Sequence, residues 1–284
     1  MPFLMRSLAV VIAMHLLVAP LCGAPSGVFR SQLVVVPNGR LRLKALLWIP
    51  AGCRRCPAIL FNHGRSATPG QHVRDGAARK LGPIFARHGY AFLFLYRRGE
   101  GLSADQGAFI TELLDREESR GGPRASDRLQ LRLLTTDHLS DGMAGVAWLR
   151  RQPAVDPHRI AVVGHSFGAQ LALLEAERDP SLQAVVAFGP AAASWKSSPM
   201  LQERLIHAAR TINAPVLILH AANDYSTLPG RVLDAERARI GKPHALRIYP
   251  PYGHTAAEGH NFLYANPAIW DADVFRFLDR RLKH

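Results

Sequence analysis

Short runs of apolar, often β-branched residues alternate along this chain with longer stretches of helical periodicity. The short runs are typical of strands buried on both faces of a sheet, and the longer stretches predict helices. The predicted strands span residues 58–62, 91–96, 160–164, 184–188, 216–220 and 246–249. The predicted helices span residues 76–88, 126–151, 167–178, 201–212, 231–240 and 268–282.

A β-hairpin is predicted ahead of these units, because residues 32–36 and 41–49 flank the turn sequence Pro37-Asn38-Gly39-Arg40. A hairpin followed by repeated strand and helix units predicts an α/β fold. Its twisted sheet has about eight strands, mostly parallel, with an antiparallel N-terminal edge and helices on both faces. The chain has 284 residues, 48% of them hydrophobic, which fits one domain over residues 27–284.

The first residues have the pattern of a secretory signal peptide. Arg6 precedes an apolar run over residues 8–19, and small residues follow up to Ser26. The run is too short for a membrane anchor, so cleavage is expected after residues 1–26, with export to the periplasm or the medium and no membrane insertion afterwards. Lipidation at Cys22 and an uncleaved anchor are the alternatives.

Two cysteines remain after the leader, Cys53 and Cys56. In an oxidising compartment they can close a small disulfide loop just before a strand. A loop disulfide or two free thiols is favoured over a redox pair, because a strand follows where a redox motif needs the start of a helix. The pair alone offers too few ligands for zinc.

The chain carries 35 Lys and Arg against 22 Asp and Glu, for a formal net charge of +13. These basic residues occur in ones and twos, without a dense run or interleaved aromatic residues, and only five are lysine. A nucleic-acid partner is therefore not expected.

The sequence Gly164-His165-Ser166-Phe167-Gly168 lies between a predicted strand and a predicted helix. This is the G-x-S-x-G nucleophile elbow, in which a strained turn lifts the serine hydroxyl clear of the backbone. Glycine is required on either side because a Cβ would collide with the neighbouring strand or helix. The motif predicts Ser166 as a nucleophile.

From these features the chain resembles the α/β-hydrolase superfamily, and within it the dienelactone-hydrolase-like and prolyl-oligopeptidase-catalytic-domain-like enzymes. The resemblance covers nearly all of the chain after the leader and implies an α/β-hydrolase fold without a large lid. Its motifs are Phe61-Asn62-His63-Gly64, Arg98-Gly99-Glu100-Gly101, the elbow, His220-Ala221-Ala222-Asn223-Asp224 and Gly259-His260-Asn261-Phe262.

A serine nucleophile needs a histidine base and an acid that orients it, and in this fold the acid precedes the histidine. Asp224 follows a predicted strand at the carboxyl edge of the sheet, whereas its rival Asp234 falls inside a predicted helix. Two histidines follow the last strand. His254 is nearer along the chain to the end of that strand, and His260 has the sequence setting of the family's base. We favour His260 and keep His254 as the alternative.

The oxyanion of acyl transfer needs pre-aimed donors. We expect one to be the backbone N–H of Phe167, and the resemblance places the second at Arg65. The Arg65 side chain has two interpretations, a contact to a substrate carboxylate or a solvated or paired arginine. His63 is expected to be structural, tying down this turn.

Two further segments carry structural expectations. The arginine–glycine turn at Arg98 implies an arginine paired with a nearby acid. Residues 105–128 are charged and broken by glycines, which predicts a mobile surface excursion near the pocket.

The sequence thus predicts a serine hydrolase that cleaves small-molecule carboxylic esters through an acyl-enzyme, without a metal or an organic cofactor. A peptidase or amidase of prolyl-oligopeptidase type would use the same site with another leaving group. A noncatalytic binding module on the same fold would need one of the three residues to be missing or blocked. The acyl and alcohol halves of the substrate and the oligomeric state are left open.

Overall fold

The computed structural model describes residues 28–66 and 73–283. The predicted signal peptide and Cys22 lie outside the described residues. None of the helices in the described part of the chain is long and apolar enough to cross a membrane.

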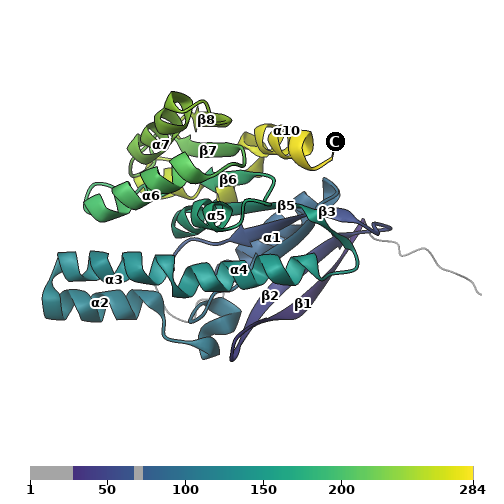
Figure 1. Ribbon diagram of the computed structural model, residues 1–284, viewed down its shortest axis with the longest axis horizontal. Helices are drawn as coiled ribbons and strands as arrows, with labels where there is room; N and C mark the ends of the chain where they lie inside the picture. Colours follow the sequence, from purple (N-terminus) through teal and green to yellow (C-terminus); the bar gives the residue numbers. More distant parts are fainter. Residues whose placement is uncertain (1–27, 67–72, 284) are drawn as a thin grey trace, which may run out of the picture.

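One eight-stranded sheet forms the centre of the molecule (Figure 1). Its strands lie in the order β1-β2-β4-β3-β5-β6-β7-β8. Strand β2 pairs antiparallel with both of its neighbours, and all other pairs are parallel. The strands span Phe29–Asn38 (β1), Leu41–Pro50 (β2), Cys56–Asn62 (β3), Ala91–Leu95 (β4), Val155–His165 (β5), Val185–Phe188 (β6), Val216–Ala221 (β7) and His244–Tyr249 (β8). The predicted sheet, with its antiparallel N-terminal hairpin, is confirmed.

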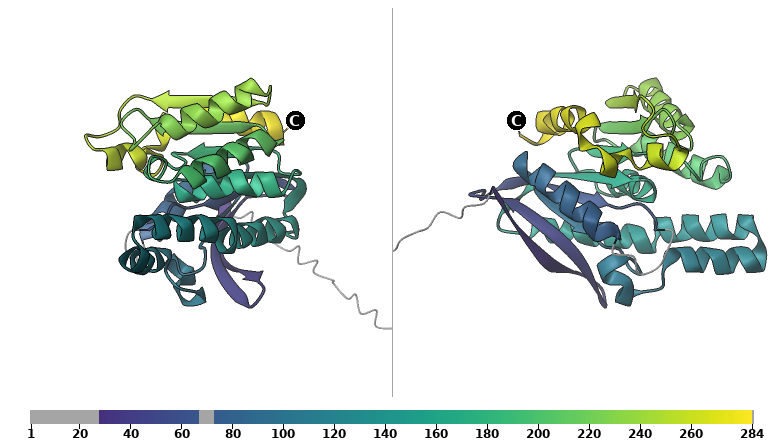
Figure 2. Two further views of the ribbon diagram at one scale, coloured as in Figure 1. Left: turned by 60° about the vertical axis from the view of Figure 1, so that its left-hand side comes forward. Right: turned by 180° about the vertical axis from the view of Figure 1, so that it is seen from behind.

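Helices cover both faces of this sheet (Figures 1 and 2). The α-helices span Val73–Arg87 (α1), Ile110–Gly121 (α2), Pro123–Thr135 (α3), Asp137–Arg150 (α4), Phe167–Arg178 (α5), Pro199–Thr211 (α6), Leu228–Arg239 (α7), Ala256–His260 (α8), Phe262–Ala265 (α9) and Asp271–Leu282 (α10). Two short 3₁₀ turns span Gly101–Gln106 (η1) and Pro267–Ile269 (η2).

The side chains of the strands alternate between two buried clusters, as the two-residue period of a strand requires. On β3, Leu60 packs into the cluster that also contains residues of α4, α5 and α6. Its neighbours Ile59 and Phe61 pack into the opposite cluster, which contains residues of α1 and α10. Because both faces are covered, every residue of β3 is buried.

Residues 105–128 project at the surface, as predicted, but they are largely helical, which the prediction did not include. This segment contains the end of η1, helix α2 and the start of α3, and α2 and α3 form a hairpin that projects from the body of the molecule (Figure 2). Two of its glycines, Gly121 and Gly122, lie at the turn between the helices, where Gly122 has a φ of 73° and Pro123 begins α3. Leu114 of α2 and Ala125 of α3 are buried, which holds the two helices together.

The single helix predicted for residues 126–151 is wrong. Thr136 has φ −119° and ψ −86°, outside the helical region, and separates α3 from α4. The periodicity continues across this residue, so the sequence pattern did not reveal the break.

Strand β8 differs from the prediction of a strand buried on both faces. It is the outermost strand of the sheet, and each of its residues is exposed or half-buried. Its sequence also contains His244 and Arg247, unlike the wholly apolar β6, and its place at the edge leaves it partly uncovered.

Candidate active site

Ser166 lies in a sharp turn between β5 and α5 with φ 54° and ψ −117°, a conformation that is strained for a residue with a Cβ. Close packing imposes this turn. A Cβ on Gly164 would lie 2.0 Å from the carbonyl oxygen of Gly168, and a Cβ on Gly168 would lie 2.0 Å from that of Asn62. The elbow glycines therefore have the steric role expected from the sequence.

Asp224 and His260 form a hydrogen-bonded pair although 36 residues separate them, with His260 Nδ1 2.7 Å from Asp224 Oδ1. Asp224 lies between β7 and α7, and His260 is the last residue of α8. The Asp224 side chain is 1% exposed and that of His260 is 8% exposed. Because a carboxylate only accepts, Nδ1 of His260 carries the proton and Nε2 offers its lone pair.

The alternative base His254 lies elsewhere. It is exposed, and its backbone N–H donates to Glu258 Oε2 over 2.8 Å. Glu258 and Thr255 form a capping box that starts α8, and this short helix carries the chain back to Asp224 at His260. The rival acid Asp234 pairs instead with His244 of β8 over 2.6 Å.

The electrostatics of Asp224 depend on a second histidine that sequence reasoning missed. His220 Nδ1 lies 2.8 Å from Asp224 Oδ2, and the backbone N–H of Tyr225 donates to Oδ1 over 2.7 Å. Burial alone would raise the pKa of Asp224, but the hydrogen bonds from His220 and His260 outweigh it and lower the pKa to about 2. The carboxylate is therefore charged at neutral pH.

A cavity of about 700 Å³ contains both Ser166 and His260 in its wall. Arg65 and Lys80 also line it, and none of the described lining residues is Asp or Glu. The ring of Tyr225, 51% exposed, packs edge-on against His260 at 5.2 Å. Ser166 and His260 thus share a cavity whose described wall carries two basic side chains and no acidic one.

His165, the residue before the nucleophile, connects the elbow to the histidine loop. Its Nε2 lies 2.9 Å from the carbonyl oxygen of His260, and because that oxygen only accepts, His165 donates. The two rings lie 4.7 Å apart. Sequence reasoning treated this position as a variable place in the motif.

The two expected oxyanion donors belong to segments next to Ser166. Phe167 is the first residue of α5, so its N–H has no carbonyl partner within the helix. The turn that carries Arg65 follows Gly64, where a Cβ would lie 3.2 Å from Cβ of Ser166. The Arg65 side chain is exposed and lines the cavity.

A buried arginine that sequence reasoning missed supports both donors. Arg97, 0% exposed, donates to the carbonyl oxygens of His63 over 2.7 Å and of Gly64 over 3.3 Å. Its guanidinium also lies over the ring of Phe167 at 5.3 Å from the centroid. His63 is fully buried with Nδ1 2.7 Å from the carbonyl oxygen of Gly64, in agreement with its expected structural role.

Arg98, next to it, behaves as the turn motif predicted. Its guanidinium pairs with Asp141 over 2.7 Å and with Asp137 over 3.0 Å. Thr111, at the start of α2, donates from Oγ1 to the carbonyl oxygen of Ser66 over 2.7 Å. The projecting hairpin is thereby attached to the turn beside Arg65.

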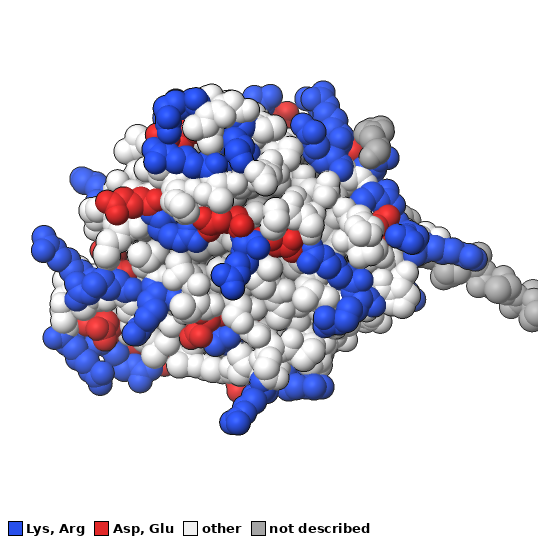
Figure 3. Space-filling view, in the orientation of Figure 1, with Lys and Arg blue, Asp and Glu red and all other residues white. Residues whose placement is uncertain are grey.

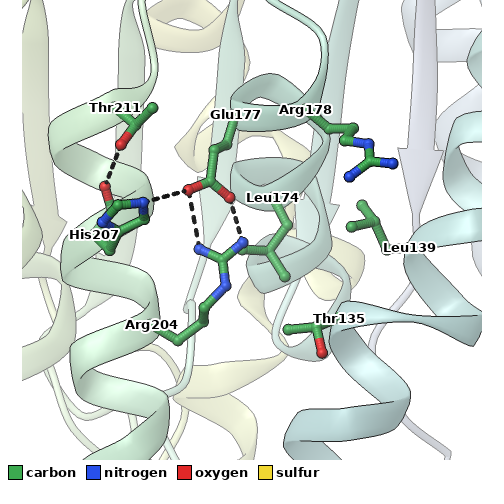
Figure 4. A pocket seen from close by; sticks show the side chains of 8 residues that line it. All are labelled: Thr135, Leu139, Leu174, Glu177, Arg178, Arg204, His207 and Thr211. Carbon is green, nitrogen blue, oxygen red and sulfur yellow. Dashed lines mark hydrogen bonds and ion pairs between the residues drawn. The ribbon is translucent and has the colours of Figure 1, made fainter.

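A second cavity, of about 500 Å³, is lined by residues of α3, α4, α5 and α6 and contains no pair like Ser166 and His260 (Figure 4). Glu177 in its wall is paired with Arg204 and His207.

On the face shown in Figure 3, Lys and Arg are spread widely, with Asp and Glu between them. Within the described residues, no group of three or more His, Cys, Asp or Glu side chains is arranged to hold a metal ion.

The sequence profile of the dienelactone hydrolase family matches residues 45–274. No curated protein matches the sequence. The structure is similar to a dienelactone hydrolase from Anabaena variabilis, with a TM-score of 0.61 and 20% identity over 90% of this chain and 100% of that one. It is also similar to an acylaminoacyl peptidase from Pyrococcus horikoshii, with a TM-score of 0.63 and 19% identity over 90% of this chain and 42% of that one.

An esterase from Pyrococcus furiosus has a TM-score of 0.62 and 16% identity over 89% of this chain and 92% of that one. At such identities the likeness is one of fold. These neighbours share the α/β-hydrolase fold, which confirms the fold predicted from the sequence.

Proposed function

Because the chain belongs to the dienelactone hydrolase family, we propose that it hydrolyses carboxylic esters through an acyl-enzyme formed on Ser166. The family, together with neighbours of the same fold that are named as esterases or peptidases, supports a hydrolase of the esterase or peptidase type. The observation that carries the proposal is the Asp224–His260 hydrogen bond of 2.7 Å at the edge of the cavity that also contains Ser166.

In the proposed reaction, Nε2 of His260 takes the proton of Ser166 while Oγ attacks the ester carbonyl. The carbonyl electron pair moves to oxygen, where the N–H groups of Phe167 and Arg65 stabilise the oxyanion. Collapse of the intermediate breaks the bond to the alkoxy oxygen, which receives the proton from His260. Water then repeats these steps on the acyl-enzyme and releases the acid, while Asp224 stabilises the imidazolium each time.

The charge of the cavity favours an ester over a substrate with a free amino terminus. A peptidase that binds an ammonium group needs a carboxylate near the scissile bond. The described wall of this cavity presents Arg65 and Lys80 and no Asp or Glu. Neutral or anionic substrates are thus compatible with it, and the described wall offers no carboxylate partner to a cationic one.

The proposal is tested by labelling with a fluorophosphonate and by turnover of two substrate sets. We expect wild type to be labelled and Ser166→Ala not to be. A chain-length series of nitrophenyl esters is expected to be hydrolysed much faster than aminoacyl nitroanilides. A preference for the anilides would favour the peptidase, and a folded wild type that resists labelling would favour the binding module.

We also propose that the protein is exported to the periplasm or the medium. The leader pattern over residues 1–26 supports this, as does the disulfide between Cys53 and Cys56, because such bonds persist in oxidising compartments. Cell fractionation with N-terminal sequencing tests it. A cytosolic protein that keeps its first 26 residues would contradict export.

A further inference from the structure

The carboxylate of Asp224 accepts hydrogen bonds from two histidines, one on each oxygen. Oδ1 faces His260 Nδ1 at 2.7 Å and Oδ2 faces His220 Nδ1 at 2.8 Å. The Asp224 side chain is 1% exposed, so neither oxygen can readily exchange its protein partner for bulk water. The two bonds together fix the plane of the carboxylate.

His220 is held in place on its far side. Its side chain is 0% exposed, and Nε2 is buried without a hydrogen-bond partner among the described residues. A Cβ on Gly230 would lie 2.6 Å from this nitrogen, so α7 packs directly against the ring. The ring therefore has little room to turn, and Nδ1 stays directed at Asp224.

We propose that His220 is a positioning residue of the proposed hydrolase, which holds Asp224 in the orientation that His260 requires. The inference rests on the proposed function, since it concerns the same three-residue site. If the N–H of His220 were removed, the charged and buried Oδ2 of Asp224 would lose this hydrogen-bond donor. The carboxylate would rotate until Oδ2 finds another hydrogen-bond donor, and this rotation would weaken the hydrogen bond between Oδ1 and His260.

This role affects the reaction and leaves substrate binding largely unchanged, because His220 is not among the described residues that line the cavity. Loss of a group that orients a functional side chain from behind typically costs 10- to 100-fold, by analogy with the outer partners of metal ligands. We therefore expect a fall in kcat of about 10- to 100-fold with little change in KM.

The test compares variants that differ in one donor. His220→Asn keeps an amide N–H near the position of Nδ1, whereas His220→Gln carries its amide nearer to Nε2, and His220→Leu has no donor. His244→Leu is the matched control, because His244 also pairs with an aspartate, Asp234, over 2.6 Å, away from the site. We measure kcat and KM on a nitrophenyl ester, and thermal melting by circular dichroism.

We expect kcat to fall in His220→Leu and His220→Gln, to recover in His220→Asn, and to stay near wild type in His244→Leu. If His220→Leu does not fold, the comparison of Asn with Gln decides. Wild-type kcat in a folded His220→Gln or His220→Leu would overturn the inference, as would a folded His220→Asn no better than His220→Gln.

The same assay separates this inference from the proposed function. Wild type and Ser166→Ala are measured beside the His220 variants. An inactive wild type overturns both proposals. Activity that depends on Ser166 but not on His220 overturns only the positioning role.

Discussion

Gly189 lies directly against the ring of His260. A Cβ on this glycine would lie 3.0 Å from both Nδ1 and Cε1 of the ring, and equally close to Oδ2 of Asp224. Gly189 follows β6 with φ 56°, in the left-handed region that glycine enters without strain. The residue after the carboxyl end of β6 thus packs directly against the Asp224–His260 pair.

Gly189→Ala should impair the reaction and modestly destabilise the fold. The new methyl group displaces the histidine by a few tenths of an ångström, and the left-handed backbone costs about 1 kcal/mol. We expect kcat/KM on a nitrophenyl ester to fall by about 10- to 100-fold, with a lower melting temperature. Gly241→Ala is the control for backbone strain, because Gly241 has φ 67° and a Cβ added there would meet no atom within 4 Å. Equal activity losses in both variants would contradict the explanation.

The two histidines of the loop after β8 should behave differently. His260→Ala removes the partner of Asp224, and we expect kcat to fall by about 10⁴-fold or more, as in other enzymes of this mechanism. His254→Ala leaves the Asp224 pair intact, and its activity should stay within about twofold of wild type. Fluorophosphonate labelling gives an independent measurement. Loss of labelling in His254→Ala alone would make His254 the base.

Arg97→Lys should lower kcat more than it raises KM. Lysine keeps the charge but cannot bind the carbonyl oxygens of His63 and Gly64 in the fork geometry of a guanidinium. The turn that carries Arg65 would then be less fixed, and we expect about a tenfold loss in kcat. Steady-state kinetics with a melting curve measures both effects. Arg98→Lys, which alters the ion pair with Asp141, is the neighbouring control; an equal loss of kcat there would argue against a specific role for Arg97.

The residues of this site that could be predicted have a local sequence signal, whereas those that were missed act through contacts between residues far apart in the sequence. Ser166 and its glycines could be predicted because the strand–turn–helix context is local. Asp224 follows a strand directly, so its place at the sheet edge was also accessible. The contact of His165 with the carbonyl of His260 spans 95 residues and depends on how the last loop folds back, which no local pattern records.

Similar reasons explain the other differences. His220 is the last residue of the predicted apolar strand, where a histidine resembles a simple strand terminus, and only its spacing of four residues from Asp224 gave a signal. In the α2–α3 hairpin, α2 was not predicted because its sequence is charged, whereas most of α3 fell within the helix predicted for residues 126–151. The helices of this hairpin are stabilised by buried positions such as Leu114 and Ala125, which are few and widely spaced.

Glu175 should make stability fall as pH rises. It is fully buried on α5, and burial raises its pKa to about 8 although the hydrogen bonds from Asn62 and the charge of Arg97 act in the other direction. The folded protein keeps this proton up to about pH 8, whereas the unfolded chain releases it near 4.5. Between these values this group lowers the free energy of unfolding by up to about 1.4 kcal/mol per pH unit.

Glu175→Gln removes this dependence and keeps an oxygen that can accept from Asn62. Urea unfolding at several values between pH 5 and pH 8 should therefore show the variant gaining on wild type as pH rises. Glu177→Gln, two residues along the same helix, controls for the loss of an acidic side chain. Parallel pH dependences for wild type and Glu175→Gln would show that Glu175 titrates normally.

The partly uncovered edge strand β8 has a consequence for how activity is lost on heating. The segment that carries His260 leaves the sheet from this strand, whose residues are exposed or half-buried, while every residue of β7 beside it is buried. Proteins open locally at their least protected elements before they unfold as a whole. Opening of β8 and the segment after it would separate His260 from Asp224 and leave the inner strands paired. We therefore expect activity to be lost on heating at a lower temperature than that at which the core melts.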